Sequence, residues 1–222
     1  MTTDDLPLVG AAIQTGWEKL TSNFWLCVGV VLCSMIIPIV VPTVLLKAAG
    51  AAMNADLAGN AFWSPLAGLA GKVMNIVVEM GLLKVALSLN DRGEAEFKQL
   101  FSCLPLFLNY LAASILYGLI VLVGVLLLIV PGIIWSIQFQ FYNYAIVDEG
   151  LGPIAALERS SQITKGAKWQ VLGLNIMVFL ISLAGVLCFV VGIIPAEAVA
   201  VIAVANVYRR LSAKRQVGGL TA

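Results

Sequence analysis

The chain has 222 residues, of which 61% are hydrophobic and 11% are charged, and its net charge is +1. Charged residues make up about a quarter of an average soluble domain, so this composition indicates a polytopic membrane protein. Histidine is absent, which removes the commonest metal ligand and general base, and the sequence has no basic tract of the nucleic-acid-binding kind. We therefore expect no cofactor, no metal site and no nucleic-acid partner.

The first expected elements are an amphipathic helix and two membrane spans. Apolar side chains near the start recur at i, i+4, i+7 and i+11, which is the spacing of one helix face: Ile13, Trp17, Leu20 and Phe24. Two apolar runs follow, at 25–46 and 66–89. Each is long enough to cross the bilayer core, which takes about 20 residues.

The second of these runs contains ionisable residues. Glu79 lies in its middle, and Lys72 lies seven residues earlier on nearly the same helix face. Charged groups are costly at this depth and suggest a proton or substrate relay, so Lys72 and Glu79 form a candidate intramembrane polar site. The alternative is structural, with Glu79 protonated or hydrogen-bonded between helices while Lys72 and Lys84 reach toward opposite interfaces.

A second amphipathic helix is expected at 94–104, followed by spans three and four. The two spans meet at Pro131-Gly132. Proline lacks an amide donor and glycine relaxes the backbone, so this pair predicts a sharp turn between antiparallel spans. Span four ends at Asp148-Glu149-Gly150.

A third amphipathic helix begins near Ile154. At 100° per residue, one side carries Ala156, Ser160, Ile163 and Ala167, flanked by Leu157 and Thr164, and the other carries Glu158, Arg159, Gln162 and Lys165. We interpret it as a helix lying on the membrane surface, with Lys165 and Lys168 near its C-terminal end. Spans five and six follow at 171–191 and 195–208, and the last has a stripe of small residues that allows close helix packing.

The predicted fold is therefore an all-α polytopic membrane protein with six transmembrane helices arranged as three hairpins, each preceded by an amphipathic helix. A single domain covers 1–211, and it divides into three pseudo-repeats at 8–92, 94–150 and 152–211. A basic flexible tail follows at 212–222. The four cysteines lie in or beside apolar runs without metal-ligand spacing, and we expect them to be core residues.

The distribution of Lys and Arg predicts the orientation. With six spans and the N-terminus inside, most cations fall on the cytoplasmic side, as do all three amphipathic helices. We expect an inner-membrane protein with both termini in the cytoplasm. Its predicted surface for anionic inner-leaflet lipid or a protein partner consists of Arg159, Lys165, Lys168, Arg209 and Arg210.

Several short stretches resemble a known family. They are Pro131-Gly132-Ile133-Ile134, residues 148–152, residues 155–160, Thr164-Lys165-Gly166 with Trp169, and the closing Tyr208-Arg209-Arg210-Leu211. They are similar to an uncharacterised prokaryotic membrane-protein family, itself similar to the membrane domain of some glycerophosphoryl diester phosphodiesterases. The resemblance implies a six-helix inner-membrane protein. It does not carry over the phosphodiesterase chemistry, which resides in a separate soluble barrel.

Three classes of function remain open. The favoured one is a non-enzymatic scaffold or accessory protein, which shapes the membrane or binds a partner and forms homo-oligomers. The second is a small transporter or channel with Glu79 in its path. The third, an intramembrane enzyme acting on lipid, requires a catalytic constellation that these residues do not supply, since Ser160-Ser161 lacks a partner base.

Overall fold

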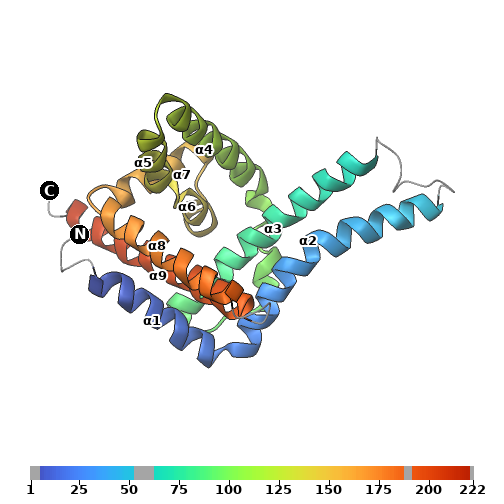
Figure 1. Ribbon diagram of the computed structural model, residues 1–222, viewed down its shortest axis with the longest axis horizontal. Coiled ribbons are helices and arrows are strands. Elements are labelled where there is room, and N and C mark those ends of the chain that lie inside the picture. Colours follow the sequence, from blue (N-terminus) through green and yellow to red (C-terminus); the bar gives the residue numbers. More distant parts are fainter. Residues whose placement is uncertain (1–5, 53–62, 188–191, 221–222) are drawn as a thin grey trace.

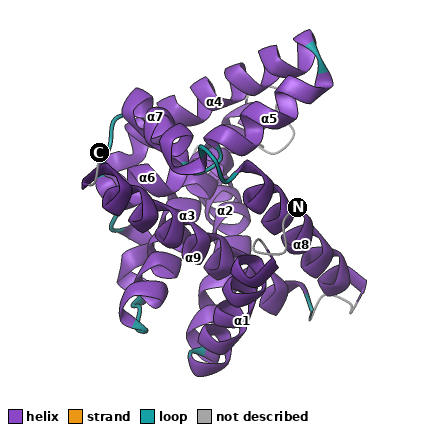
Figure 2. Cartoon of the chain, turned by 90° about the vertical axis from the view of Figure 1, so that its left-hand side faces the viewer, coloured by secondary structure: helices purple, strands orange, loops and turns teal. Residues whose placement is uncertain are grey.

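In this computed structural model every regular element is a helix among the residues that it describes, 6–52, 63–187 and 192–220. Figure 2 shows this all-helical architecture. In chain order the helices are α1 (Leu6–Ser22), α2 (Phe24–Ala52), α3 (Trp63–Arg92), the 3₁₀ helices η1 (Phe97–Phe101) and η2 (Leu104–Leu106), α4 (Phe107–Leu127), α5 (Ile129–Phe139), α6 (Tyr142–Glu149), α7 (Pro153–Thr164), α8 (Lys168–Leu187) and α9 (Ile193–Leu220).

Helix α9 lies at the centre of the packing. It contacts α1, α2, α3, α7 and α8, and its buried side carries many small residues. The three stripe residues predicted from the sequence, Ala196, Ala200 and Ala203, are all buried. Gly16 allows α1 to approach α9 closely, because a Cβ added at Gly16 would come within 2.9 Å of the Val199 carbonyl oxygen.

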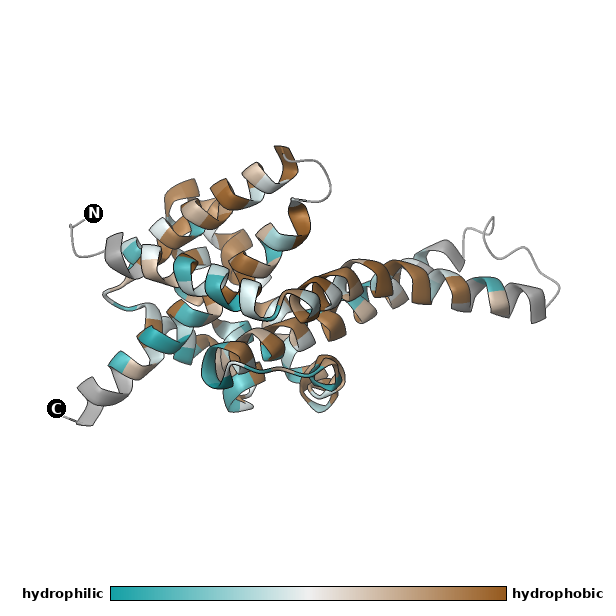
Figure 3. Ribbon diagram, turned by 90° about the horizontal axis from the view of Figure 1, so that it is seen from below, coloured by the Kyte–Doolittle hydropathy of each residue, from teal (hydrophilic) through white to brown (hydrophobic). Residues whose placement is uncertain are grey.

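Among the described residues, four helical segments are long and apolar enough to cross a membrane. They are Phe24–Val44, Gly68–Arg92, Phe97–Leu127 and Lys168–Leu187. The predicted spans one, two, three and five correspond to these segments. The six-span arrangement is not confirmed. Predicted span four is divided between α5 and α6, and predicted span six, which lies in α9, is not among the candidate spans. The α2–α3 and α4–α5 hairpins also point away from the body in different directions (Figures 1 and 3).

The sides of these segments are strongly apolar. Figure 3 shows hydrophobic residues along the α2–α3 hairpin and hydrophilic residues gathered on the central body. Ile39, Leu126 and Phe179, for example, are each at least 65% exposed. Contiguous exposed apolar surface of this kind marks a membrane or protein interface, and on helices of this length it indicates lipid.

The turn between α4 and α5 lies earlier than the sequence predicted. It falls at Leu128, whose backbone is extended, and Pro131 and Gly132 lie in the first turn of α5. A proline is tolerated there because its missing N–H has no helical acceptor. Gly132 allows α5 to pack closely against α4, since a Cβ on Gly132 would come within 2.8 Å of the backbone nitrogen of Val125 on α4.

The second amphipathic helix, predicted at 94–104, is also different. This segment forms η1 and η2 rather than an α-helix, and Pro105 cannot donate the hydrogen bond that an α-helix would require. The segment packs on α3 at Gly81, where an added Cβ would collide with the Leu100 carbonyl group. Gly81 therefore allows the backbone of η1 to lie directly against α3.

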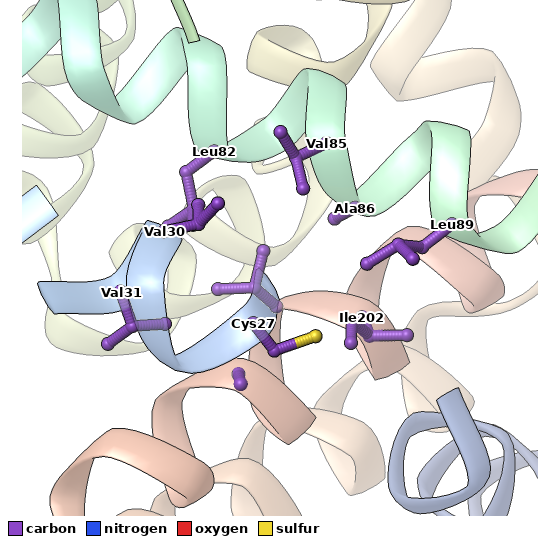
Figure 4. A pocket seen from close by; sticks show the side chains of 10 residues that line it. Cys27, Val30, Val31, Leu82, Val85, Ala86, Leu89 and Ile202 are labelled. Atoms are coloured by element: carbon purple, nitrogen blue, oxygen red, sulfur yellow. The ribbon is translucent and has the colours of Figure 1, made fainter. Parts of the chain in front are cut away.

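A small apolar cavity lies where α2, α3 and α9 meet. Cys27 of α2 and Ile202 of α9 face one another across it, below Val85 and Leu89 of α3 (Figure 4). Cys27, Cys33 and Cys103 are free thiols, while Cys188 lies outside the described residues. Helix α9 continues to Leu220, through most of the segment predicted to be a flexible tail, and it is anchored there by the buried Leu211 and Ser212.

Candidate functional site

The candidate intramembrane polar site is divided along α3. Glu79 lies within the candidate span Gly68–Arg92, and one of its carboxylate oxygens accepts a hydrogen bond from the hydroxyl of Tyr110 at 2.9 Å. Lys72 lies two helical turns earlier, about 10 Å along the axis, beside an open groove between α2 and α3. Within the described residues, Glu79 is therefore paired with a tyrosine of α4 and not with Lys72.

A cluster of tyrosines and a serine continues from Glu79 into the packing of α4 and α6. Tyr110 is buried, and its ring centroid lies 6.0 Å from that of Tyr142. The Tyr142 hydroxyl is 3.0 Å from the hydroxyl of Ser114, and the Tyr117 ring lies 5.0 Å from the Tyr142 ring. Sequence reasoning did not identify these residues, because single tyrosines in apolar runs give no signal of being near one another.

The helical path is interrupted between α5 and α6, at Gln140 and Phe141. The side chain of Ser160, on α7, forms hydrogen bonds with two backbone groups at this break. Its hydroxyl accepts from the amide of Phe141 at 3.0 Å and donates to the carbonyl of Gln138 at 3.1 Å. Ser160 is fully buried, so a non-helical backbone is accommodated in the interior by one side chain from a neighbouring helix.

Helix α7 has the buried side that the sequence spacing defined. Its buried residues are Ala156, Leu157, Ser160, Ile163 and Thr164. This side packs against α4, α5, α6 and α9, so protein fills it and only the opposite side of α7 is available to lipid.

Lys168 links α8 to α5. Its ammonium group donates to the side-chain oxygen of Gln138 at 2.7 Å, and the nitrogen of the same amide donates to the hydroxyl of Ser161 on α7 at 2.8 Å. Lys168 and the exposed Trp169 are the first two residues of a candidate span. This is the position at which cationic and aromatic residues mark a membrane–water interface.

Ion pairs join four helices, α3, α6, α7 and α9. Arg209 of α9 donates to both carboxylate oxygens of Asp148 of α6, at 2.6 and 2.7 Å, and to Asp91 of α3 at 2.5 Å. Arg159 of α7 donates to Glu149 of α6 at 2.9 Å. We call these five residues the charged end.

The electrostatics of the charged end favour an ionised Arg209. Burial lowers its pKa, but hydrogen bonds and charge from Asp148 and Asp91 outweigh burial and raise the pKa above the usual value. Arg209 is therefore a permanent cation held between two carboxylates. Arg159 also donates to the hydroxyl of Ser212 at 3.0 Å, which fixes α7 to α9.

The five cations predicted to form a lipid or partner surface are thus in different situations. Arg159 and Arg209 pair with carboxylates of the same chain, and Lys168 contacts Gln138. Lys165 and Arg210 are exposed. Sequence reasoning did not pair the arginines with Asp91, Asp148 and Glu149, although each acid stands beside a helix-stopping glycine or turn signal.

These features define the class of the protein. Apolar helix sides, four candidate spans and a charged end describe an all-helical integral membrane protein. Within the described residues, no three His, Cys, Asp or Glu side chains are grouped so as to hold a metal ion.

Comparison with known proteins gives the family. Residues 69–213 match the model of a domain of unknown function (DUF7847). The match covers more than half of the chain, so the chain belongs to this family. It is also similar to a UPF0259 membrane protein of Sodalis glossinidius (strain morsitans), with 30% identity over 120 residues. That alignment covers 54% of this chain and 48% of the relative, so the chain spans about half the relative's length. No solved structure matches.

Proposed function

We propose that the protein is a non-enzymatic scaffold or accessory protein of a prokaryotic inner membrane, and that its charged end lies at the cytoplasmic leaflet and contacts anionic lipid. This proposal rests on the observation that charged residues and apolar surface lie on different parts of the protein. The described ion pairs join α3, α6, α7 and α9 at the charged end, whereas the sides of the candidate spans are apolar. Both termini would then lie in the cytoplasm, as the distribution of Lys and Arg favours.

The proposed lipid surface is narrower than the sequence suggested. Arg159 and Arg209 pair with carboxylates of the chain itself. We assign the surface to Lys165 and Arg210 because they are exposed, and to Lys168 because it begins a candidate span. A Lys or Arg near an anionic membrane surface contributes about 1 kcal/mol of attraction. Three such residues would orient the protein on an anionic leaflet without a dedicated binding cavity. We also propose that the protein shapes the membrane and forms homo-oligomers. Its similarity to the membrane domain of some glycerophosphoryl diester phosphodiesterases is likewise a proposal.

The test compares stability in two lipid compositions. Wild type and Lys165→Glu/Arg210→Glu are placed in nanodiscs of phosphatidylcholine, with or without phosphatidylglycerol. Thermal unfolding is followed by a thiol-reactive fluorogenic dye that reports the exposure of Cys27 and Cys103, both buried. We expect phosphatidylglycerol to raise the unfolding temperature of wild type more than that of the variant, each measured relative to the same protein in phosphatidylcholine. An identical response to phosphatidylglycerol in both would count against the proposal.

A second candidate is a small transporter or channel. The observation in its favour is an ionisable Glu79 with an exposed side chain within a candidate span. Glu79→Gln keeps an oxygen that can accept from Tyr110 but removes the charge, so folding should be preserved while a proton-coupled flux is lost. If Glu79→Gln vesicles retain every flux that wild type shows, this candidate loses its basis.

A further inference from the structure

Two apolar grooves flank α5, and they differ in charge. One lies between α5 and α8, and its lining includes Val130, Ile134, Ile137, Leu172, Trp169 and Lys168. The other lies between α4 and α5, and it is lined only by apolar residues, among them Leu119, Val123 and Trp135. The α5–α8 groove therefore has a cation at one end, and the α4–α5 groove does not.

Lys168, the cation of the α5–α8 groove, lies at the end of the groove nearest the membrane–water interface. Lys168 and Trp169 begin the candidate span Lys168–Leu187, and the Lys168 ammonium is fixed by Gln138 at the C-terminal end of α5. Val130 lies eight residues before Gln138, about 12 Å farther along the helix toward the α4–α5 turn. The groove thus runs from a fixed positive charge at the interface into the apolar layer.

We propose that this groove binds an anionic phospholipid of the surrounding leaflet. One acyl chain lies along Ile134, Ile137 and Leu172, and the phosphate lies at Lys168 and is flanked by the exposed indole of Trp169. An ammonium group has three donors, so Lys168 can donate to a phosphate oxygen while it keeps its bond to Gln138. This inference rests on the proposed contact with anionic lipid, and it adds a defined site and ligand class.

The two grooves provide a matched pair of fluorescent reporters. A protein that retains Trp169 alone reports on the α5–α8 groove, and one that retains Trp135 alone reports on the α4–α5 groove. Each protein is reconstituted in vesicles of ordinary phosphatidylcholine that contain 10 mol% of one brominated lipid. The brominated lipid is either phosphatidylglycerol or phosphatidylcholine, and the bromine atoms on its acyl chains quench tryptophan fluorescence on contact. Random lipid contact gives equal quenching by both lipids.

We expect Trp169 to show about a fivefold preference for the anionic brominated lipid, the ratio expected when one lysine attracts a lipid of net negative charge. Trp135 should show equal quenching by the two lipids. Lys168→Gln should abolish the preference at Trp169. Ile134→Phe, which fills the groove and keeps the charge, should lower quenching at Trp169 by both lipids.

Equal quenching of Trp169 by both lipids in the wild-type background would overturn the proposal of an anionic site. A preference that survives Lys168→Gln would overturn the assignment to this residue. Neither result touches the Lys165 and Arg210 experiment, so failure of the groove site and failure of the proposed function are separable. Circular dichroism of each variant checks that the helices are retained.

Discussion

The break between α5 and α6 depends on one hydroxyl group, and removing it has a predictable cost. Ser160→Ala deletes the acceptor of the Phe141 amide and the donor to the Gln138 carbonyl, while leaving the helical backbone of α7 intact. Ser160 and Phe141 are both fully buried, so water cannot replace the lost partner without a local opening.

The magnitude follows from the two groups that lose a partner. An unsatisfied buried donor or acceptor costs about 1–3 kcal/mol. The bond to the Gln138 carbonyl is only partly buried, so we count that group at about 1 kcal/mol, and the pair predicts a loss of about 2–4 kcal/mol. For a chain of this length that corresponds to an unfolding temperature about 5–15 °C lower. The control is Ser22→Ala, because the exposed hydroxyl of Ser22 bonds only to the Glu18 carbonyl of its own helix. That control should change stability by less than about 0.5 kcal/mol.

Two measurements check the reasoning. Thiol exposure on heating gives the unfolding temperature, and hydrogen exchange of the Phe141 amide in detergent micelles gives the local effect. We expect both an earlier transition and faster exchange at Phe141 in Ser160→Ala. If Phe141 stays protected and the transition does not move, the break is held by something other than Ser160.

Two further predictions concern the packing and the charged end. Gly81→Ala should destabilise the protein strongly, because its Cβ would meet the backbone of η1, whereas Gly118→Ala should be neutral or stabilising since nothing lies within 4 Å of that position. Thermal unfolding of the two glycine variants distinguishes them, and equal transitions would contradict the close contact. Arg209→Met should cost about 2–3 kcal/mol, between the values for exposed and buried pairs, because Arg209 is 33% exposed and Asp148 is 16% exposed. Adding Asp148→Asn should recover part of this loss, and a strictly additive double variant would show that the pair is not coupled.

The sequence predicted features that depend on local pattern. Hydrophobic length located the four candidate spans, because crossing a bilayer imposes a minimum run of apolar residues whatever the tertiary structure. Helical periodicity likewise identified the buried side of α7. The repeat at 8–92, 94–150 and 152–211 stays a prediction, since the structure does not test it.

Features that depend on contacts between distant segments were not accessible from the sequence. Pro131-Gly132 signals a turn, but proline is equally suited to the first turn of a helix, and Gly132 is needed for the approach of α4. The break before α6 carries no proline or glycine, and its stabilising partner, Ser160, lies about 20 residues away in the chain. Arg209 was predicted to be a surface cation. Its partner Asp91 lies more than 100 residues earlier, and the sequence gives no sign that the two residues are close in space.

The central claim is that α7 and the charged end lie on the cytoplasmic face of the membrane. Gln162 is exposed on α7, so Gln162→Cys in a background without the four native cysteines provides a direct reporter. Labelling with a membrane-impermeant maleimide is compared in right-side-out and inverted vesicles, with Lys47→Cys as the reporter for the opposite face. We expect Gln162→Cys to react only in inverted vesicles and Lys47→Cys only in right-side-out vesicles. Reaction of Gln162→Cys in right-side-out vesicles would contradict it.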